Sequence, residues 1–230
     1  MDRLASAELD ELHYDWEIAY GQLIRESVKR SPRRRSLVSE AYKGLIEILA
    51  ERRRRAGRRL DTMGFCENYT EEIASMLGPP PASLLDIGCS TGVFVSAMLA
   101  RGYQACGIDV SEECIRLGCE RLRTQFPEAI GNVRVGDFLS YPFEAGSYDL
   151  VFSNDVLEHI PPDEADDFLS KVFQVLKPGG LLWIITVNRW SGPGDATTVK
   201  HPLGTPSRGL HLKEYTLGEL AALLRRNGFR

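Results

Sequence analysis

Five short apolar runs alternate with helical segments from residue 83 onward, and this alternation limits the fold more than any other feature of the chain. The runs are 83–88, 104–111, 132–138, 148–155 and 181–187. Strands that alternate with helices predict an α/β fold, a doubly wound and mostly parallel sheet. The last two runs are apolar on both faces, as a sheet covered by helices on both sides requires.

The first 78 residues have a different pattern, which predicts a helical extension. Apolar residues between 37 and 49 recur at spacings of one, three and four, which is typical of an amphipathic helix. The sequence GPPP at 78–81 breaks any helix and acts as a joint. We therefore expect a helical cap over 1–78 and a ligand-binding core over 79–230.

Composition is ordinary for a globular protein, with 43% hydrophobic and 26% charged residues in a chain of 230. No apolar run approaches the ~20 residues of a membrane span, and the acidic, polar N-terminus does not resemble a secretory signal. The five cysteines contain no CxxC pair. This usage predicts a cytoplasmic protein with free thiols and no metal site.

Charge is distributed unevenly along the chain. Residues 1–60 carry 14 Lys/Arg against 10 Asp/Glu, whereas 61–230 carry 14 against 22. The basic clusters at 29–36 and 51–59 would suit an anionic partner such as nucleic acid. Because acids are interleaved and no aromatic side chains stand among the arginines, a solvated helix face is the preferred interpretation, and nucleic acid is not expected as a partner.

Acidic residues close the first three strands of the predicted sheet. Asp86 precedes the glycine-rich turn in LLDIGCSTGVF, and Asp109 and Asp137 end the next two apolar runs. In such sheets ligands bind beyond the carboxyl ends of the strands. Asp109 follows Gly88 by 21 residues, where an acid that binds ribose is expected. The pattern predicts a nucleotide-like ligand.

A dinucleotide-dependent enzyme is one alternative, with the fingerprint G-x-G-x-x-G. Here Ser90 stands at the position of the middle glycine. Asp86 would also repel a pyrophosphate, whereas it suits a ligand that carries an ammonium group. An aspartate after a strand can also act only as a helix cap, so each acid has a structural alternative.

Five ordered blocks between 80 and 229 resemble the motifs of class I S-adenosylmethionine (SAM)-dependent methyltransferases of the small-molecule type. The blocks are LLDIGCSTG, GIDVS, GDF, YDLVFSNDVLEHI and LKPGGLLWI. The resemblance implies a Rossmann-like fold, SAM as cofactor and S-adenosylhomocysteine as product.

The resemblance also implies a role for each motif residue. Asp86 would fix the amino group of SAM, Asp109 would accept both ribose hydroxyls, and Asp137 would accept from the adenine amino group. The cofactor-binding set that it implies is Asp86, Gly88, Cys89, Ser90, Gly92, Asp109, Val110, Asp137, Phe138, Asn154 and Asp155. Within this set Val110 and Phe138 would sandwich the adenine, while Asn154 and Asp155 would line the floor near the methyl group.

Methyl transfer needs alignment of donor and acceptor, exclusion of water and, for some acceptors, removal of a proton. His159, in LEHI, is the first candidate base and His211 the second; a hydrogen-bonded wall residue is the structural alternative for both. Tyr14 and Tyr20 are candidates to close the acceptor pocket, or they pack without a binding role. No metal is required.

The acceptor is expected to be a small molecule. The Gly/Pro-rich segment 188–210 resembles a variant of bacterial small-molecule methyltransferases with the run N-R-x-x-G-P-x-D, which favours a metabolite or natural product. A segment this long without strands or helices indicates a functional loop or disorder.

The sequence departs from the family where it ends. Strands six and seven of the resembling fold are not found, so the chain is expected to be a truncated form, a fragment or a protein completed by a partner. The run 181–187 would then be an open sheet edge, and we expect poor solubility or dimerisation through it. This departure opens a further alternative, a SAM-binding or partner-binding module without turnover of its own.

Overall fold

The computed structural model describes residues 2–57 and 69–230, and Cys66, one of the five cysteines, lies outside them. The described chain forms two compact units. The sheet unit comprises the described part of Asp61–Asn154 together with Asp167–Ile185. The helical unit comprises the described part of Met1–Leu60 with Asp155–Asp166 and Thr186–Arg230. The boundary near residue 78 stays a prediction.

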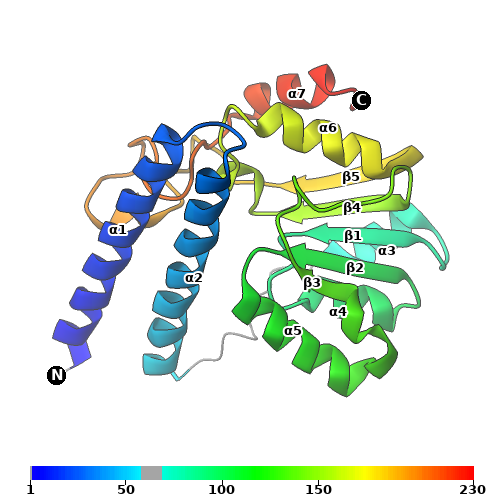
Figure 1. The fold of residues 1–230 in the computed structure, drawn as a ribbon, viewed down its shortest axis with the longest axis horizontal. Helices are drawn as coiled ribbons and strands as arrows, with labels where there is room; N and C mark the ends of the chain where they lie inside the picture. The colour runs from blue at the N-terminus through cyan, green and yellow to red at the C-terminus, as the bar shows by residue number, and fades with distance from the viewer. Residues whose placement is uncertain (1, 58–68) are drawn as a thin grey trace. The chain divides into compact units, whose positions relative to one another are not determined.

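The sheet unit is built on five strands in the order β3-β2-β1-β4-β5, and every pairing is parallel (Figure 1). The strands are β1 (Ser83–Ile87), β2 (Gln104–Asp109), β3 (Val133–Val135), β4 (Tyr148–Asn154) and β5 (Leu176–Ile185). The order reverses between β1 and β4, so the carboxyl ends of these two strands flank a topological switch point. The predicted α/β class and parallel sheet are confirmed.

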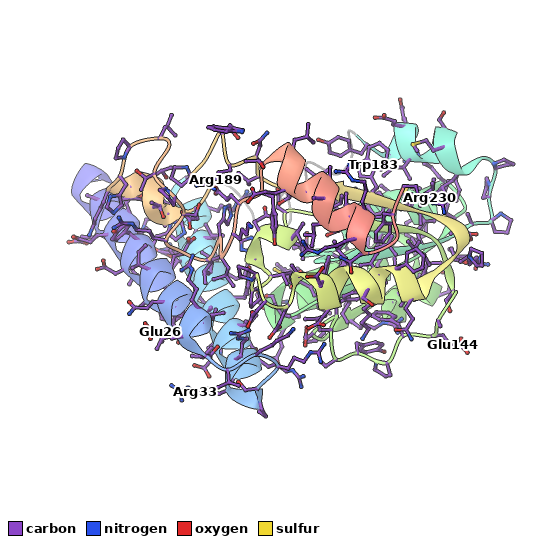
Figure 2. All side chains as sticks on the ribbon, turned by 90° about the horizontal axis from the view of Figure 1, so that it is seen from above. Glu26, Arg33, Glu144, Trp183, Arg189 and Arg230 are labelled. Atoms are coloured by element: carbon purple, nitrogen blue, oxygen red, sulfur yellow. The ribbon has the colours of Figure 1, made fainter. Side chains whose placement is uncertain are left out.

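Helices flank this sheet. They are α3 (Thr70–Leu77), α4 (Val93–Ala100), α5 (Glu112–Gln125) and α6 (Ala165–Val175), with a 3-10 turn, η3, at Pro127–Asn132. Phe94 of α4 stacks on Phe152 of β4, with ring centroids 4.0 Å apart. Trp183 of β5, labelled in Figure 2, lies 6.0 Å from the ring of Tyr69 at the start of α3. Phe94 and Phe152 belong to the hydrophobic core of the sheet unit, and Tyr69 and Trp183 pack against that core.

The fifth strand begins earlier than the sequence predicted. The glycine stop in LKPGG was expected to precede a strand at 181, whereas β5 starts at Leu176. Tyr148 pairs with Leu176 and Leu150 with Leu181, so β5 contains an irregularity opposite the start of β4. Gly179 takes a left-handed conformation there, with φ 81°, and this conformation allows the strand to continue through the glycines.

In the helical unit, α1 (Asp2–Glu26) and α2 (Pro32–Arg55) lie side by side (Figure 1). Ser31 caps α2 by accepting from the main-chain N–H of Arg34 at 3.1 Å. Leu37, Ala41 and Leu45 are buried on one face, which confirms the predicted amphipathic stripe.

Three shorter helices complete this unit: η4 (Leu157–His159), η5 (Ala196–Val199) and α7 (Leu217–Arg226). A capping box is present at the start of α7, where Thr216 and Glu219 each accept from the other's main-chain N–H. Among the helices of the described ranges, none is both long enough and apolar enough to cross a membrane.

Candidate active site

The glycine-rich turn between β1 and α4 has a left-handed main chain. Gly88, Ser90 and Gly92 have φ values of 73°, 48° and 67°. The main-chain N–H groups of Gly88 and Cys89 both donate to the carbonyl of Ile108 in β2, at 2.9 and 3.1 Å. Ser90 has a Cβ and pays a steric penalty in this conformation. The turn is therefore held against the carboxyl end of β2.

Asp109, the last residue of β2, organises the same turn. Its Oδ2 accepts from the N–H of Ser90 at 2.9 Å, and its Oδ1 accepts from the N–H of Ser111 at 2.8 Å. Burial raises the pKa of Asp109, while the main-chain donors of Ser111, Ser90 and Val110 oppose that rise. Each carboxylate oxygen can accept more than one hydrogen bond, so lone pairs remain for ligand hydroxyls.

Asp86 is the second acid of this site and is only 3% exposed. Burial, and then the neighbouring charge of Asp109, raise the pKa of Asp86 well above its usual range. A positive charge bound beside Asp86 and Asp109 would stabilise the charged forms of both carboxyls. The residues present therefore fit a ligand with an ammonium group and hydroxyls, and they fit a pyrophosphate poorly.

The Cys89 side chain is part of the hydrophobic core of the sheet unit. Burial, with the nearby acids Asp86 and Asp109, raises the pKa of the Cys89 thiol well above its usual range. A Cβ at Gly107 of β2 would lie 2.5 Å from the Cβ of Cys89, so only glycine fits beneath the turn. Cys89 is thus a packing residue whose main chain belongs to the turn, and its thiol is not an activated nucleophile.

The predicted adenine residues follow β2 and β3. Asp137 accepts from the N–H of Leu139 at 3.0 Å and from the hydroxyl of Ser140 at 2.9 Å. Phe138 is 5% exposed and packs edge-on against Phe168 of α6, with centroids 5.4 Å apart. Val110 is partly buried after β2. Their contacts with adenine stay a prediction.

The predicted floor residues lie at the end of β4. Asn154 is the last residue of that strand and pairs with Ile185. Asp155 follows with φ 52° and an exposed side chain. Asn154 therefore shares the carboxyl edge of the sheet with Asp86 and Asp109, and its place near the methyl group stays a prediction.

The helical unit brings the two candidate bases together. The rings of His159 and His211 meet edge to face, with centroids 4.7 Å apart. Nδ1 of His159 lies 2.9 Å from the carbonyl of Leu210, and Nδ1 of His211 lies 2.8 Å from Oε1 of Glu214. Burial, and then His211, lower the pKa of His159 to about 4, so its imidazole is neutral at pH 7.

Tyr14 and Tyr20 lie on α1 and both are partly buried. The Tyr14 hydroxyl lies 3.0 Å from Nε2 of His201, and Lys200 Nζ lies 4.4 Å from the Tyr14 ring centroid. The Tyr20 ring packs 4.5 Å from Trp16. Both tyrosines are thus engaged in contacts within the helical unit, and a role in acceptor binding stays a prediction.

Sequence reasoning did not single out the residues that fix the 188–210 segment. Glu17 of α1 accepts from the N–H groups of Ala196 and Leu210, at 3.1 and 3.4 Å. Arg25 donates to the carbonyls of four residues near the end of the segment: Ser207, Arg208, Gly209 and His211. The segment is therefore ordered by α1, and no local signal could reveal partners more than 170 positions away.

The sheet order and the left-handed glycine turn define a doubly wound α/β fold, and the acids at the strand ends suit a nucleoside-like ligand. The family described as "Methyltransferase domain" matches residues 49–230. The chain belongs to this family, the class I SAM-dependent methyltransferases.

Relatives within the family act on different small molecules, according to their names. The chain is 29% identical over 157 residues to ubiquinone biosynthesis O-methyltransferase of Idiomarina loihiensis, covering 65% of this chain and 58% of that protein. It is 30% identical over 151 residues to phosphoethanolamine N-methyltransferase 2 of Caenorhabditis elegans, covering 65% of this chain and 33% of that protein. The match thus spans only about a third to three-fifths of these relatives.

One solved structure combines sequence identity above a quarter with a similar fold. The chain resembles a phosphoethanolamine N-methyltransferase 2 of Haemonchus contortus with a TM-score of 0.55 and 26% identity, over 70% of this chain and 36% of that one. That structure contains phosphomonomethylethanolamine and S-adenosylhomocysteine. The chain also resembles a SAM-dependent methyltransferase of Archaeoglobus fulgidus, with a TM-score of 0.59 and 21% identity over 80% of this chain and 74% of that one. At this identity the similarity supports the fold alone.

Proposed function

We propose that this chain transfers a methyl group from SAM to a small-molecule acceptor. The observation that carries the proposal is the pair of acids, Asp86 and Asp109, beside a left-handed glycine turn at the carboxyl edge of the sheet. Burial raises the pKa of both carboxyls, and a cationic group bound beside them would favour their charged forms.

The cofactor is proposed to lie in the sheet unit. Asp86 would pair with its ammonium group, Asp109 would accept from its ribose hydroxyls, and Asp137 with Phe138 would receive the adenine. The main chain of Gly88, Ser90 and Gly92 would approach the ligand closely, since two of these three positions carry no side chain. When bound, SAM supplies a methyl group on a positively charged sulfur.

Some methyl acceptors must lose a proton before or during transfer. For these we assign His159, in the helical unit, as the general base. Neutral His159 has its Nδ1 beside a carbonyl, so Nδ1 carries the proton and Nε2 retains its lone pair. His211 is oriented by Glu214 in the same way. The free lone pair of neutral His159 is suited to general-base work.

The acceptor is proposed to be a metabolite or natural product. The names of the relatives include an O-, an N- and a C-methyltransferase. The last is 24-methylenesterol C-methyltransferase 2 of Oryza sativa subsp. japonica. It is 33% identical over 124 residues, which cover 51% of this chain and 34% of that protein. Tyr14 and Tyr20 of the cap, and the segment 188–210, are proposed to shape the acceptor pocket.

We also propose self-association. Within the described sheet β5 is an edge strand, paired on one side with β4. An open edge is a template for another strand, and a second copy of the chain would supply one. Analytical ultracentrifugation tests this: a dimer is expected, and a monodisperse monomer at high concentration would contradict it.

The activity itself is tested with SAM labelled on its methyl group and a panel of small hydroxyl- and amine-bearing acceptors. Formation of S-adenosylhomocysteine together with a labelled acceptor is expected. Tight binding of S-adenosylhomocysteine without turnover on any acceptor would favour the alternative, a binding module.

A further inference from the structure

Three potential metal ligands gather in the helical unit: Glu158, His159 and His211. Each offers one ligand atom, and these atoms all lie within 4.8 Å of one another. Glu158 is 0% exposed and His211 is 8% exposed. Two imidazoles and a carboxylate form a donor set that suits zinc and neighbouring divalent transition metals.

The hydrogen bonds of the two histidines prepare them for this role. A carbonyl oxygen only accepts, so the 2.9 Å contact with Leu210 places the proton of His159 on Nδ1. The 2.8 Å contact of His211 with the Glu214 carboxylate does the same. With the proton on Nδ1, the neutral form of each ring keeps a lone pair on Nε2. Imidazole ligands of metals are held in this way, through an outer carboxylate or carbonyl.

The third ligand has an unused oxygen. Oε2 of Glu158 accepts from the Thr186 hydroxyl at 2.8 Å. Oε1 of Glu158 is buried and has no hydrogen-bond partner among residues 2–57 and 69–230. A buried carboxylate oxygen without a partner is costly, and a cation removes that cost.

The geometry points to a divalent transition-metal site, which we propose is formed by Oε1 of Glu158 and the Nε2 atoms of His159 and His211. Leu210 and Glu214 are its outer partners. Three protein ligands leave a fourth tetrahedral position open for water or for a ligand heteroatom. In the metal-loaded chain the two histidines act as ligands, because their lone pairs are no longer available to a proton. Ion binding does not depend on the proposed methyl transfer.

The test uses the full chain, freed of metal by dialysis against a chelator and titrated with Zn²⁺ by calorimetry. One ion per chain is expected, and Glu158→Gln or His211→Ala should each weaken binding by more than about tenfold. The matched control is His201→Ala, a histidine of the same unit outside the cluster, which should bind as the unaltered chain does.

Co²⁺ spectroscopy on the unaltered chain keeps the proposal testable if a variant fails to fold. Visible d–d bands without a thiolate-to-metal charge-transfer band are expected, since the ligands are nitrogen and oxygen. A charge-transfer band would assign the ion to cysteine thiols and overturn the proposal. So would the lack of stoichiometric binding, or binding that survives both ligand substitutions.

Titration of the same samples with S-adenosylhomocysteine separates this inference from the proposed function. The cofactor residues belong to the sheet unit and the metal ligands to the helical unit. Cofactor binding without metal binding would therefore refute only the metal site. Metal binding without cofactor binding would refute only the proposed function.

Discussion

The main-chain N–H of Ser90 donates to Oδ2 of Asp109 at 2.9 Å, which joins the glycine-rich turn to the end of β2. The other oxygen of Asp109 accepts from Ser111, the residue that caps α5. One carboxylate thus fixes two turns that face the carboxyl edge of the sheet. Asp109 therefore shapes the turn through its hydrogen bonds, in addition to its proposed role with the ribose.

Because Gly92 in the glycine-rich turn is left-handed, adding a side chain there is expected to lower the free energy of unfolding. Gly92 has φ 67°, and a Cβ there would lie 3.2 Å from Cγ1 of Val133. We expect Gly92→Ala to lower the free energy of unfolding by about 1–2 kcal/mol, because L-residues are strained in this conformation. Gly131→Ala is the control, since nothing lies within 4 Å of that Cβ and its φ is not left-handed. Equal effects of the two substitutions in urea titrations would contradict the account.

Much of this turn follows from the sequence. The acids at 86 and 109 lie at strand ends and the glycines at 88 and 92 lie in the turn that follows β1. Strand ends follow from local apolar patterns that stop. The contacts of His159 and His211 could not be predicted in the same way. These residues are separated by 51 others, and their proximity depends on Glu17, Arg25 and Glu214, which hold the segment between them through hydrogen bonds that no local pattern encodes. The early start of β5 was missed because glycines usually interrupt a strand, whereas here they form its irregularity.

Asp86 predicts how cofactor binding depends on pH. Its pKa is raised by burial and by Asp109, and an ammonium group on the ligand favours the ionised carboxylate. Affinity for S-adenosylhomocysteine should therefore fall as the pH is lowered through the raised pKa of Asp86, and binding near that pH should release protons.

The measurement is calorimetric titration across a pH series, in buffers of different ionisation enthalpy. In Asp86→Asn the affinity should be lower, and the part of its pH dependence that comes from Asp86 should disappear. An unchanged pH profile in this variant would show that Asp86 does not meet the ammonium group.

His159 predicts a pH dependence of stability. Its pKa is about 4 in the folded chain and ~6.5 when unfolded. The unfolded state therefore takes up the proton first as the pH falls. The contribution of neutral His159 to the free energy of unfolding is complete above pH ~6.5. It declines toward pH 4 by up to about 1.4 kcal/mol per pH unit.

The difference in unfolding free energy between the unaltered chain and His159→Gln isolates this contribution from the other acids. That difference should shrink between about pH 6.5 and pH 4 in metal-free buffer. A constant difference over this range would mean that His159 titrates normally in the folded chain.

Substitution of Arg34, which forms a buried ion pair, is expected to lower the free energy of unfolding strongly. Its guanidinium donates to Glu164 at 2.9 Å and to Asp163 at 2.8 Å, and the Arg34 and Glu164 side chains are 5% and 8% exposed. Arg34→Met would leave the Glu164 carboxylate buried without its cation. We expect a loss of about 3 kcal/mol in unfolding free energy.

Arg33 of the same helix, labelled in Figure 2, provides the matched control because its side chain is exposed. Arg33→Met should change stability by less than about 0.5 kcal/mol. A similar small change for Arg34→Met, measured by urea unfolding, would show that the pair contributes little.

The central claim is that the acids at the carboxyl edge of the sheet hold SAM. Calorimetric titration of the full chain with S-adenosylhomocysteine, beside Asp109→Ala, tests it most directly. We predict saturable binding of one ligand per chain, abolished in Asp109→Ala while circular dichroism shows that the variant stays folded. Failure of the unaltered chain to bind, or equal binding by a folded Asp109→Ala, would contradict the assignment of this site.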